Sequence, residues 1–419
     1  MSIYINGHKE MTINKKIVEY IKPQVIYIPL SNKNGVEYRH LIKEGDYVYK
    51  GQVVAYNDQI NFPIHSSVSG YAVKGVKKII NNGEKIKCIA VENDFKERYE
   101  TSKGAKRIIN KYDKKEFLEM LKEYGITGLG GSDFPTFLKY SSSDNFEYLL
   151  VNGVECEPFI TADVSLMLEH AEDILEAVDA IIEIMNLKKA IICIKNVNYK
   201  VIEEFLKYKG SYPNITIFPT LDKYPNGWER NVVSDTLGIT YNKYPSEKGI
   251  IVSNVSTIYA IYEMLKYNRP LTERVITITG EGIKNPQNVK VKIGASIKEI
   301  INYIDGYNNL KNPLFIAGGP MMGKSLPVDD LVVTKDLSCV IVMEDNFKLP
   351  KECIKCGKCI EVCPAHIMPV VIKNNLDDKD ALRKLRPDRC IECGLCSYIC
   401  PSRIEVRECV RLAKERMIK

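Results

Sequence analysis

The stretch that decides the fold reads CIKCGKCIEVCP from Cys353 to Pro364, and its pattern returns as CIECGLCSYICP from Cys390 to Pro401. Each copy is C-x2-C-x2-C-x3-C-P, the run that wraps cubic iron-sulfur clusters. In two-cluster proteins the fourth cysteine of each run ligates the other cluster. The pattern therefore predicts two 4Fe-4S clusters, cluster one on Cys353, Cys356, Cys359 and Cys400, and cluster two on Cys390, Cys393, Cys396 and Cys363.

Zinc binding and disulfides are the other uses of clustered cysteines, and both fit this spacing less well. Zinc sites favour paired C-x2-C knuckles closed by a distant second pair. Disulfide frameworks belong to small secreted domains. Elsewhere in the chain, scattered cysteines are expected to be inert buried thiols, although Cys156 lies inside a functional motif. These are Cys88, Cys156, Cys193, Cys339 and Cys409.

Length and charge bound the remaining possibilities. The chain has 419 residues, which suggests about three domains, and a net charge of +6 from 59 basic and 53 acidic residues. This small excess predicts no field for binding nucleic acid. The N-terminus lacks the apolar core of a signal peptide, and no run of about eighteen apolar residues could span a bilayer. We therefore expect a cytoplasmic protein, peripheral on the cytoplasmic face of the membrane where its partner is a membrane complex.

The first hundred residues predict a small all-β unit. Short strands over Val25–Leu30, Leu41–Ala55 and Ile64–Val73 are separated by glycine turns. The arrangement resembles the barrel-sandwich fold of lipoyl and biotinyl carriers. Because His65-Ser66-Ser67 stands at the hairpin tip, where a carrier has its lysine, a docking or structural role is favoured over a swinging arm.

The middle of the chain alternates strands and helices. Tyr148–Asn152, Ala190–Lys195 and Ile215–Phe218 predict core strands, with helices over Asp163–Met185 and Val201–Lys207 between them. This alternation predicts a parallel sheet with helices on both faces. Ligands of such sheets bind at the carboxyl ends of strands, so Asn152, Glu155 and Glu157, which end or follow the first strand, are candidates for a polar ligand.

Three segments carry a resemblance to a known family: GLGGSDFPTFLK from Gly128 to Lys139, NGVECEP from Asn152 to Pro158, and SNVST from Ser253 to Thr257. They resemble the NADH-binding flavoprotein subunit of complex I and, more closely, the RnfC proteins of Rnf ferredoxin:NAD oxidoreductases. The resemblance implies non-covalent FMN and NADH. It also implies an FMN site at Gly128, Gly130 and Gly131, with Lys139, Asn152, Glu155, Asn254 and Thr257 around it, and Glu229 on the nucleotide side.

Ser132-Asp133, Trp228 and Ser256 depart from the family's pattern. The Asp133 carboxylate would either repel the nucleotide diphosphate or point to solvent. Trp228 replaces a residue that is small in the family. These departures bear on the nicotinamide step rather than on the fold.

The resemblance also implies the domain order. We expect a barrel-sandwich domain at 1–100, a Rossmann-like FMN/NADH domain at 115–262 after a charged linker at 96–118, a β-grasp (SLBB-type) module at 268–345, and a bacterial-ferredoxin-like two-cluster domain at 346–419. Strand Val275–Thr279, strand Val289–Ile293 and helix Ile297–Ile304 belong to the β-grasp module. Its turn Gly318–Gly323 is as readily a plain turn as a part of the flavin site. An amphipathic helix is expected over Ile404–Lys419.

The chain is thus expected to be an NADH-dependent oxidoreductase, the NADH-side subunit of a membrane complex, with other electron-transfer subunits, ferredoxin or a reductase as partners. No side chain need act as acid or base, because the cofactors carry the chemistry. Two alternatives stay open. One is a soluble relative that feeds electrons to a proline reductase or cobalamin reductase, and the other is a scaffold with clusters only.

Overall fold

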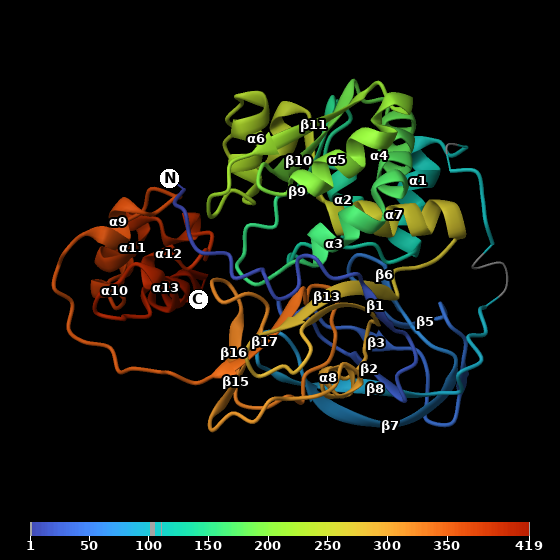
Figure 1. Ribbon diagram of the computed structural model, residues 1–419, viewed down its shortest axis with the longest axis horizontal. Helices are drawn as coiled ribbons and strands as arrows, with labels where there is room; N and C mark the ends of the chain where they lie inside the picture. The colour runs from blue at the N-terminus through green and yellow to red at the C-terminus, as the bar shows by residue number, and fades with distance from the viewer. Residues whose placement is uncertain (1, 101–104, 110, 419) are drawn as a thin grey trace.

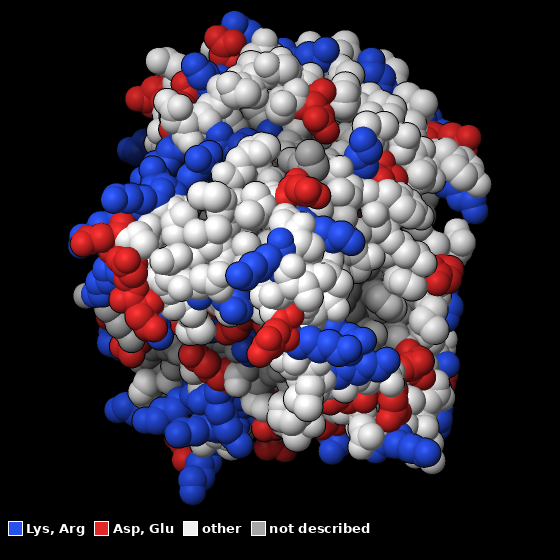
Figure 2. Space-filling view, turned by 90° about the vertical axis from the view of Figure 1, so that its left-hand side faces the viewer, with Lys and Arg blue, Asp and Glu red and all other residues white. Residues whose placement is uncertain are grey.

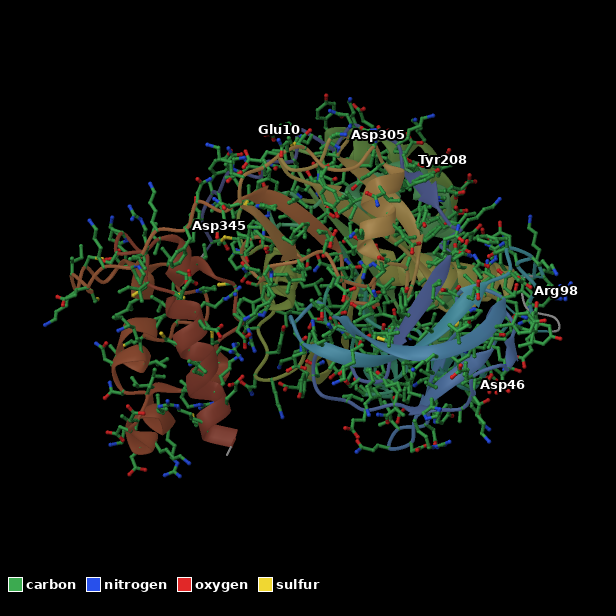
Figure 3. The ribbon with its side chains drawn as sticks, turned by 90° about the horizontal axis from the view of Figure 1, so that it is seen from below. Glu10, Asp46, Arg98, Tyr208, Asp305 and Asp345 are labelled. Atoms are coloured by element: carbon green, nitrogen blue, oxygen red, sulfur yellow. The ribbon has the colours of Figure 1, made fainter. Side chains whose placement is uncertain are left out.

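The computed structural model describes residues 2–100, 105–109 and 111–418, so the expected linker at 96–118 lies partly outside the described residues. The chain folds into four units (Figure 1). An α/β unit lies above two β units, and a small helical unit stands apart at one side, joined to the rest by a long loop. The same separation is seen from below, where Asp345 marks the point at which this loop leaves the body (Figure 3).

The barrel unit is formed by two antiparallel sheets around one apolar core. Ile26, Val48, Val54, Val68 and Val91 have no exposed surface in this core. The expected hairpin tip at His65–Ser67 is buried, and Ser67 Oγ donates to the Ile293 carbonyl at 2.7 Å. A buried hairpin tip fits a docking or structural role of the barrel unit better than a mobile carrier arm. The sheets have the orders β2-β8-β7-β4 and β3-β5-β6, with β2 Val25–Pro29, β3 Arg39–His40, β4 Tyr47–Val48, β5 Val53–Asn57, β6 Phe62–His65, β7 Gly70–Ile79 and β8 Lys85–Asn93.

The α/β unit contains the predicted parallel sheet, in the order β11-β10-β9-β12. Leu149 and Val151 of β9 face one apolar core, and Leu150 faces a second core on the other side, so helices cover both faces. The elements are α1 Lys114–Glu123, α2 Thr136–Tyr140, β9 Tyr148–Gly153, α3 Ala162–Glu169, α4 Ala171–Met185, β10 Lys189–Lys195, α5 Tyr199–Tyr208, β11 Ile215–Thr220, α6 Glu229–Leu237, β12 Ile250–Asn254 and α7 Val255–Tyr267. Short 3-10 turns occupy Lys209–Ser211 and Pro245–Lys248.

The helix expected over 163–185 is instead two helices. His170 lies between α3 and α4 with φ −131° and ψ 32°, outside the helical region. Its ring contacts Asp173 Oδ2 at 2.9 Å and packs on the ring of Tyr259 in α7, with centroids 4.5 Å apart. These tertiary contacts interrupt a run whose apolar periodicity alone predicts one helix.

The six-stranded unit has the order β1-β14-β13-β17-β15-β16, and α8 (Ile297–Tyr303) packs in its core. Its first strand comes from the N-terminus, because Val18–Tyr20 pairs in parallel with Val289–Val291. The chain therefore contributes a strand to this sheet before it enters the barrel unit at β2. The strands are β1 Val18–Tyr20, β13 Glu273–Thr279, β14 Gln287–Lys292, β15 Pro313–Ala317, β16 Lys324–Leu326 and β17 Cys339–Glu344.

The cluster unit comprises residues 351–418 and carries both cysteine runs. Its short helices surround an apolar core of Ile372, Leu382, Val410 and Ala413. The helices are α9 Lys358–Glu361, α10 Pro369–Asn374, α11 Lys379–Leu385, α12 Leu395–Tyr398 and α13 Val406–Ile418, with a 3-10 turn at Pro387–Arg389. In the described part of the whole chain, no helix is long and apolar enough to cross a membrane.

Candidate electron-transfer site

The glycine loop at residues 128–131 rests on the N-terminal end of α7. Leu129 N donates to Thr257 Oγ1 at 2.9 Å, and a Cβ on Gly130 would lie 3.1 Å from the Cβ of Asn254, the N-cap residue of α7. The amides of Gly130, Gly131 and Ser132 donate to no group among the described residues. Consecutive free amides beside a helix N-terminus form an anion-binding concavity. The loop therefore fits the phosphate of a nucleotide such as FMN.

The carbonyl side of the same loop is held by cations from two other units. Lys33 Nζ of the barrel unit donates to the Gly131 carbonyl, and Arg274 of β13 donates to the Leu129 carbonyl at 3.3 Å. Lys33 also pairs with Asp336 at 3.0 Å. These contacts hold the carbonyl groups of Leu129 and Gly131 on one side of the loop, which leaves the free amide groups on the opposite side. Sequence analysis missed Lys33 and Arg274, because both lie far from the loop in sequence.

Asp133 neither faces the expected phosphate site nor points to solvent. Its backbone has φ 52°, and its Oδ2 accepts a hydrogen bond from Asn32 Nδ2 at 3.2 Å. Burial raises the pKa of Asp133, and Lys335 opposes that rise. The expectation that Asp133 points to solvent was wrong, because its carboxylate contacts Asn32 of the barrel unit, and its effect on the nucleotide diphosphate stays a prediction.

Lys139 and Glu229, predicted separately, lie together. Lys139 Nζ is 2.6 Å from Glu229 Oε1 and 2.9 Å from the Val252 carbonyl oxygen, and the two charged side chains are 34% and 40% exposed. Nearby, Asn152 Nδ2 donates to the Gly227 carbonyl at 2.8 Å. The pair thus joins α2 to the first turn of α6, next to Trp228. The guanidinium of Arg230 lies 5.7 Å from the Trp228 ring centroid.

The carboxylates of Glu155 and Glu157 are directed at protein donors. Glu155 accepts from the amides of Asp163 at 2.7 Å and Val164 at 3.3 Å, and it lies 3.7 Å from Lys9 Nζ. Burial raises the pKa of Glu155, while Lys9 lowers it. Glu157 accepts from the amides of Met321 at 2.7 Å and Met322 at 2.9 Å. Direct contact of either carboxylate with a flavin stays a prediction.

Asp163, which sequence analysis did not select, holds the segment that carries Asn254. It accepts from Asn254 Nδ2 at 2.6 Å and from the Ser256 hydroxyl. Burial raises the pKa of Asp163, and these hydrogen bonds lower it. Its position in the first turn of α3 is an ordinary place for an acidic residue, so no local pattern signals its contact with α7.

The second cysteine run, loop two (Cys390–Pro401), surrounds a cavity together with Cys363 of the first run. The cavity is lined by the four thiols predicted for cluster two, with apolar walls from Ile367 and Leu395. In loop one (Cys353–Pro364), burial raises the pKa of the Cys359 thiol, and the nearby thiols of Cys400 and Cys356 raise it further. No three His, Cys, Asp or Glu side chains in the described part of the chain are close enough to hold one metal ion. Four thiols spread around a cavity suit the corners of a cubic cluster.

Loop two is also where the units meet. Tyr224 of the α/β unit donates its hydroxyl to the Cys393 carbonyl at 2.7 Å. Arg407 of α13 donates to the Met321 carbonyl at 2.6 Å, and the same carbonyl oxygen lies 2.4 Å from the position of a Cβ on Gly394. The turn at Gly318–Gly323 therefore contacts the cluster unit, and Glu157 fixes it from the α/β side.

Loop one has a different environment. Cys356 is exposed, whereas Cys393 and Cys396 are buried. Ile354 is 67% exposed, and the exposed Lys355 and Lys358 lie beside it in the loop. Figure 2 views the molecule from the side on which the cluster unit lies and shows a broad uncharged area interrupted by scattered basic and acidic side chains.

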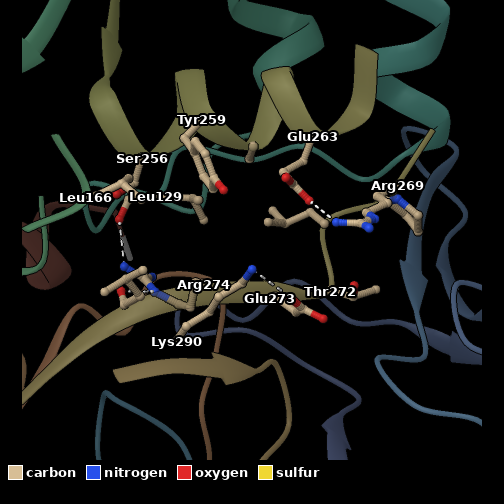
Figure 4. Close-up of a pocket in the computed structure, with 14 residues that line it drawn as sticks. Leu129, Leu166, Ser256, Tyr259, Glu263, Arg269, Thr272, Glu273, Arg274 and Lys290 are labelled. Atoms are coloured by element: carbon tan, nitrogen blue, oxygen red, sulfur yellow. Dashed lines mark hydrogen bonds and ion pairs between the residues drawn. The ribbon is translucent and has the colours of Figure 1, made fainter. Parts of the chain in front are cut away.

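A separate pocket lies between α7 and strands β13 and β14 (Figure 4). Its charged residues are already paired, because Arg269 lies 2.8 Å from Glu263 and Lys290 lies 3.5 Å from Glu273. None of the predicted site residues lines it, although it reaches the back of the glycine loop at Leu129. The glycine loop and the cysteine runs, rather than this pocket, are therefore the candidate electron-transfer site.

Comparison with known proteins gives one family over most of the chain. Four family descriptions match in order: "RnfC Barrel sandwich hybrid domain" at 2–96, "Nuo51 FMN-binding domain" at 121–263, "SLBB domain" at 275–325 and "4Fe-4S dicluster domain" at 352–404. The C subunit of the Na(+)-translocating ferredoxin:NAD(+) oxidoreductase complex of Acetobacterium woodii is 31% identical over 370 residues, covering 85% of this chain and 83% of the relative. This chain belongs to the RnfC family.

Other members match similarly. The C subunit of the proton-translocating ferredoxin:NAD(+) oxidoreductase complex of Clostridium ljungdahlii is 30% identical over 403 residues, covering 92% of this chain and 86% of that one. The chain spans only 48% of the Vibrio cholerae relative, the C subunit of an ion-translocating oxidoreductase complex, which is 30% identical. Among solved structures, an NAD+-reducing [NiFe]-hydrogenase in the air-oxidized state has TM-score 0.51 at 15% identity, covering 71% of this chain and 63% of the hydrogenase chain. That likeness shows the fold alone. The matches confirm the RnfC resemblance and the expected types of domain.

Proposed function

We propose that the chain passes electrons between NADH and two 4Fe-4S clusters through non-covalently bound FMN, as the NADH-side peripheral subunit of a ferredoxin:NAD oxidoreductase complex. The names of the relatives and the FMN-binding and dicluster matches support the proposal. The observation that carries it is the contact of loop two with the α/β unit through Tyr224 and Cys393. This contact brings a cysteine run to the unit that holds the glycine loop.

The chain's own residues bind and orient the cofactors. The free amides of Gly130, Gly131 and Ser132 bind the FMN phosphate, while Lys33 and Arg274 keep the loop carbonyls turned away. Lys139 and Glu229 lie on the nucleotide side. When bound, FMN exchanges an electron pair with NADH and single electrons with the clusters. No protein side chain has to act as acid or base in this scheme.

The surroundings of the two cysteine runs indicate the order in which electrons pass through the two clusters. Cluster two lies next to the α/β unit, because Cys393 and Leu395 are buried in the apolar cluster that contains Tyr224, while Gly394 lies against Met321 of the six-stranded unit. Cluster one is bounded by the exposed Cys356. We infer that cluster two exchanges electrons with the flavin, and that cluster one exchanges them with a partner subunit.

An anaerobic titration with NADH tests the proposal on protein purified with its clusters. Visible absorbance separates flavin bleaching from the broad iron-sulfur bands, and both are expected to bleach. A protein without flavin contradicts the proposal. So does a flavin that stays oxidised while dithionite still reduces the clusters.

A glycine variant links this result to the proposed FMN loop. Gly130→Val places a side chain against Asn254 and is expected to remove FMN while leaving the iron content unchanged. Gly210→Val is the matched control, because no atom lies within 4 Å of its added Cβ. Retention of FMN in Gly130→Val would exclude this loop as the flavin site.

Association of the wild-type chain with the membrane fraction separates the complex subunit from a soluble electron-input protein.

A further inference from the structure

The N-terminal residues contact both the α/β unit and the cluster unit. Ile3 pairs with Tyr224 through two backbone hydrogen bonds of 2.9 and 2.8 Å. Ile5 is buried in an apolar cluster that also contains Tyr224, Met321, Cys393 and Leu395. Figure 1 shows the N-terminus beside the cluster unit, close to α9.

The other end of this segment is fixed to the loop that follows β9. Phe159 N donates to the Gly7 carbonyl at 2.7 Å, and the rings of His8 and Phe159 stack with centroids 5.0 Å apart. Lys9 Nζ donates to the carbonyls of Glu155 at 2.7 Å and Ile160 at 2.6 Å. Residues 2–9 therefore join the loop of the predicted flavin site to the surface that meets loop two.

The covalent connection to the cluster unit does not fix its position. After β17, every residue from Asp345 to Glu352 is exposed, and this loop separates the cluster unit from the six-stranded unit. A loop without buried side chains leaves the attached unit free to move unless another surface holds it. The position of cluster two therefore depends on the noncovalent contacts around loop two.

We propose that residues 2–9 form a strap that positions the cluster unit for electron transfer, with Ile5 as its main positioning residue. The inference rests on the proposed function and adds the segment that aligns the α/β unit with the cluster unit. Ile5 touches the cluster-two side of the interface and is anchored by Gly7 and Lys9 two to four residues later. Loosening the strap should leave the flavin loop intact and slow only the step between flavin and cluster two.

The test compares Ile5→Asp with Tyr4→Asp in the full chain loaded with FMN and clusters. Ile5 is 8% exposed and Tyr4 is 72% exposed, so the same carboxylate is placed in the interface or in water. Stopped-flow mixing with NADH should give wild-type flavin reduction in both variants. Cluster reduction should slow about tenfold or more in Ile5→Asp, as expected when redox partners are misplaced, and stay unchanged in Tyr4→Asp. Equal cluster-reduction rates in all three proteins would overturn the strap.

A second readout does not depend on NADH. Limited proteolysis within 345–352, with small-angle scattering of the same samples, should detect a released cluster unit in Ile5→Asp but not in Tyr4→Asp or Ile5→Leu. If NADH fails to reduce wild-type flavin, the proposed function fails, while proteolysis still decides the strap. Should Ile5→Asp not fold, Ile5→Ala takes its place with the same expected direction. Wild-type proteolysis and scattering in Ile5→Ala would then contradict the inference.

Discussion

Loop one and loop two follow nearly the same backbone path. Gly357 and Gly394 have φ of 77° and 79°, and Lys355 and Glu392 have φ of 55° and 56°. The cysteine pattern and these left-handed positions are the same in both runs. Their environments differ, because a Cβ on Gly357 would meet no atom within 4 Å, whereas one on Gly394 would lie 2.4 Å from the Met321 carbonyl oxygen.

The residues between the cysteines explain this difference. Lys358 and Leu395 occupy equivalent positions, and Leu395 is fully buried while Lys358 is exposed. The lysine side chain keeps its ammonium group in water, so Lys358 favours an exposed loop. Burying the apolar surface of a leucine is favourable, so Leu395 stabilises a contact with another unit. The cysteine pattern thus specifies the cluster, and the intervening side chains specify which loop faces the α/β unit.

Replacing the fourth cysteine of each run should have the largest effect. Cys363 lies in loop one but lines the cavity of loop two, so Cys363→Ala should remove cluster two and leave cluster one. Cys400→Ala should do the opposite. Iron content and the electron paramagnetic resonance of the reduced proteins measure each loss, and only Cys363→Ala should stop electron flow from flavin. Loss of cluster one in Cys363→Ala would show that each run binds its own cluster.

The two glycines provide the next comparison. Gly394→Ala and Gly357→Ala each carry a left-handed backbone cost of about 1 kcal/mol. Gly394→Ala alone must also displace the Met321 carbonyl. We expect cluster reduction by NADH to slow about tenfold in Gly394→Ala, because the cluster unit shifts, and to change little in Gly357→Ala. Similar rates in the two variants would mean that close contact at Gly394 does not govern the transfer.

Local patterns predicted much of this architecture. The continuous apolar run at 148–152 indicated a buried parallel strand, and β9 is one. The cysteine spacing selected the four thiols that line the loop-two cavity. Both features depend on residues close in sequence, where periodicity and spacing carry the physical constraint. The contact of Lys33 with the Gly131 carbonyl could not be predicted, because no local pattern pairs residues about a hundred positions apart.

Contacts between units also determine where some of the predicted site residues point. Glu157 was predicted to bind cofactor, yet its carboxylate accepts from the amides of Met321 and Met322. Asp133 turns toward Asn32 because its backbone is left-handed, a conformation that the sequence does not signal for aspartate. Sequence motifs thus selected the candidate residues, and packing between units decides which face of each loop is available.

Side-chain truncation at the equivalent positions tests the packing itself. Leu395→Ala should cost about 2 kcal/mol or more of interface stability, the usual result of removing a buried leucine. Lys358→Ala should change stability by less than about 0.5 kcal/mol, as for other surface substitutions. Limited proteolysis within 345–352 measures release of the cluster unit in each variant. If proteolysis released the cluster unit to the same extent in both variants, packing of Leu395 would not explain why loop two, and not loop one, faces the other units.

The smallest expected effect comes from one hydroxyl group. Tyr224→Phe keeps the ring but removes the hydroxyl that donates to the Cys393 carbonyl at 2.7 Å, the bond to loop two, and to Glu157 Oε2 at 3.2 Å. A single hydrogen bond contributes about 0.5–1.5 kcal/mol, so amide exchange at loop two should accelerate about two- to tenfold. Tyr398→Phe is the control, because Tyr398 lies in the same loop, is 56% exposed and makes no hydrogen bond through its hydroxyl among the described residues. Equal exchange in the two variants would leave apolar packing around Leu395 and the Gly394 contact as the forces that hold loop two in place.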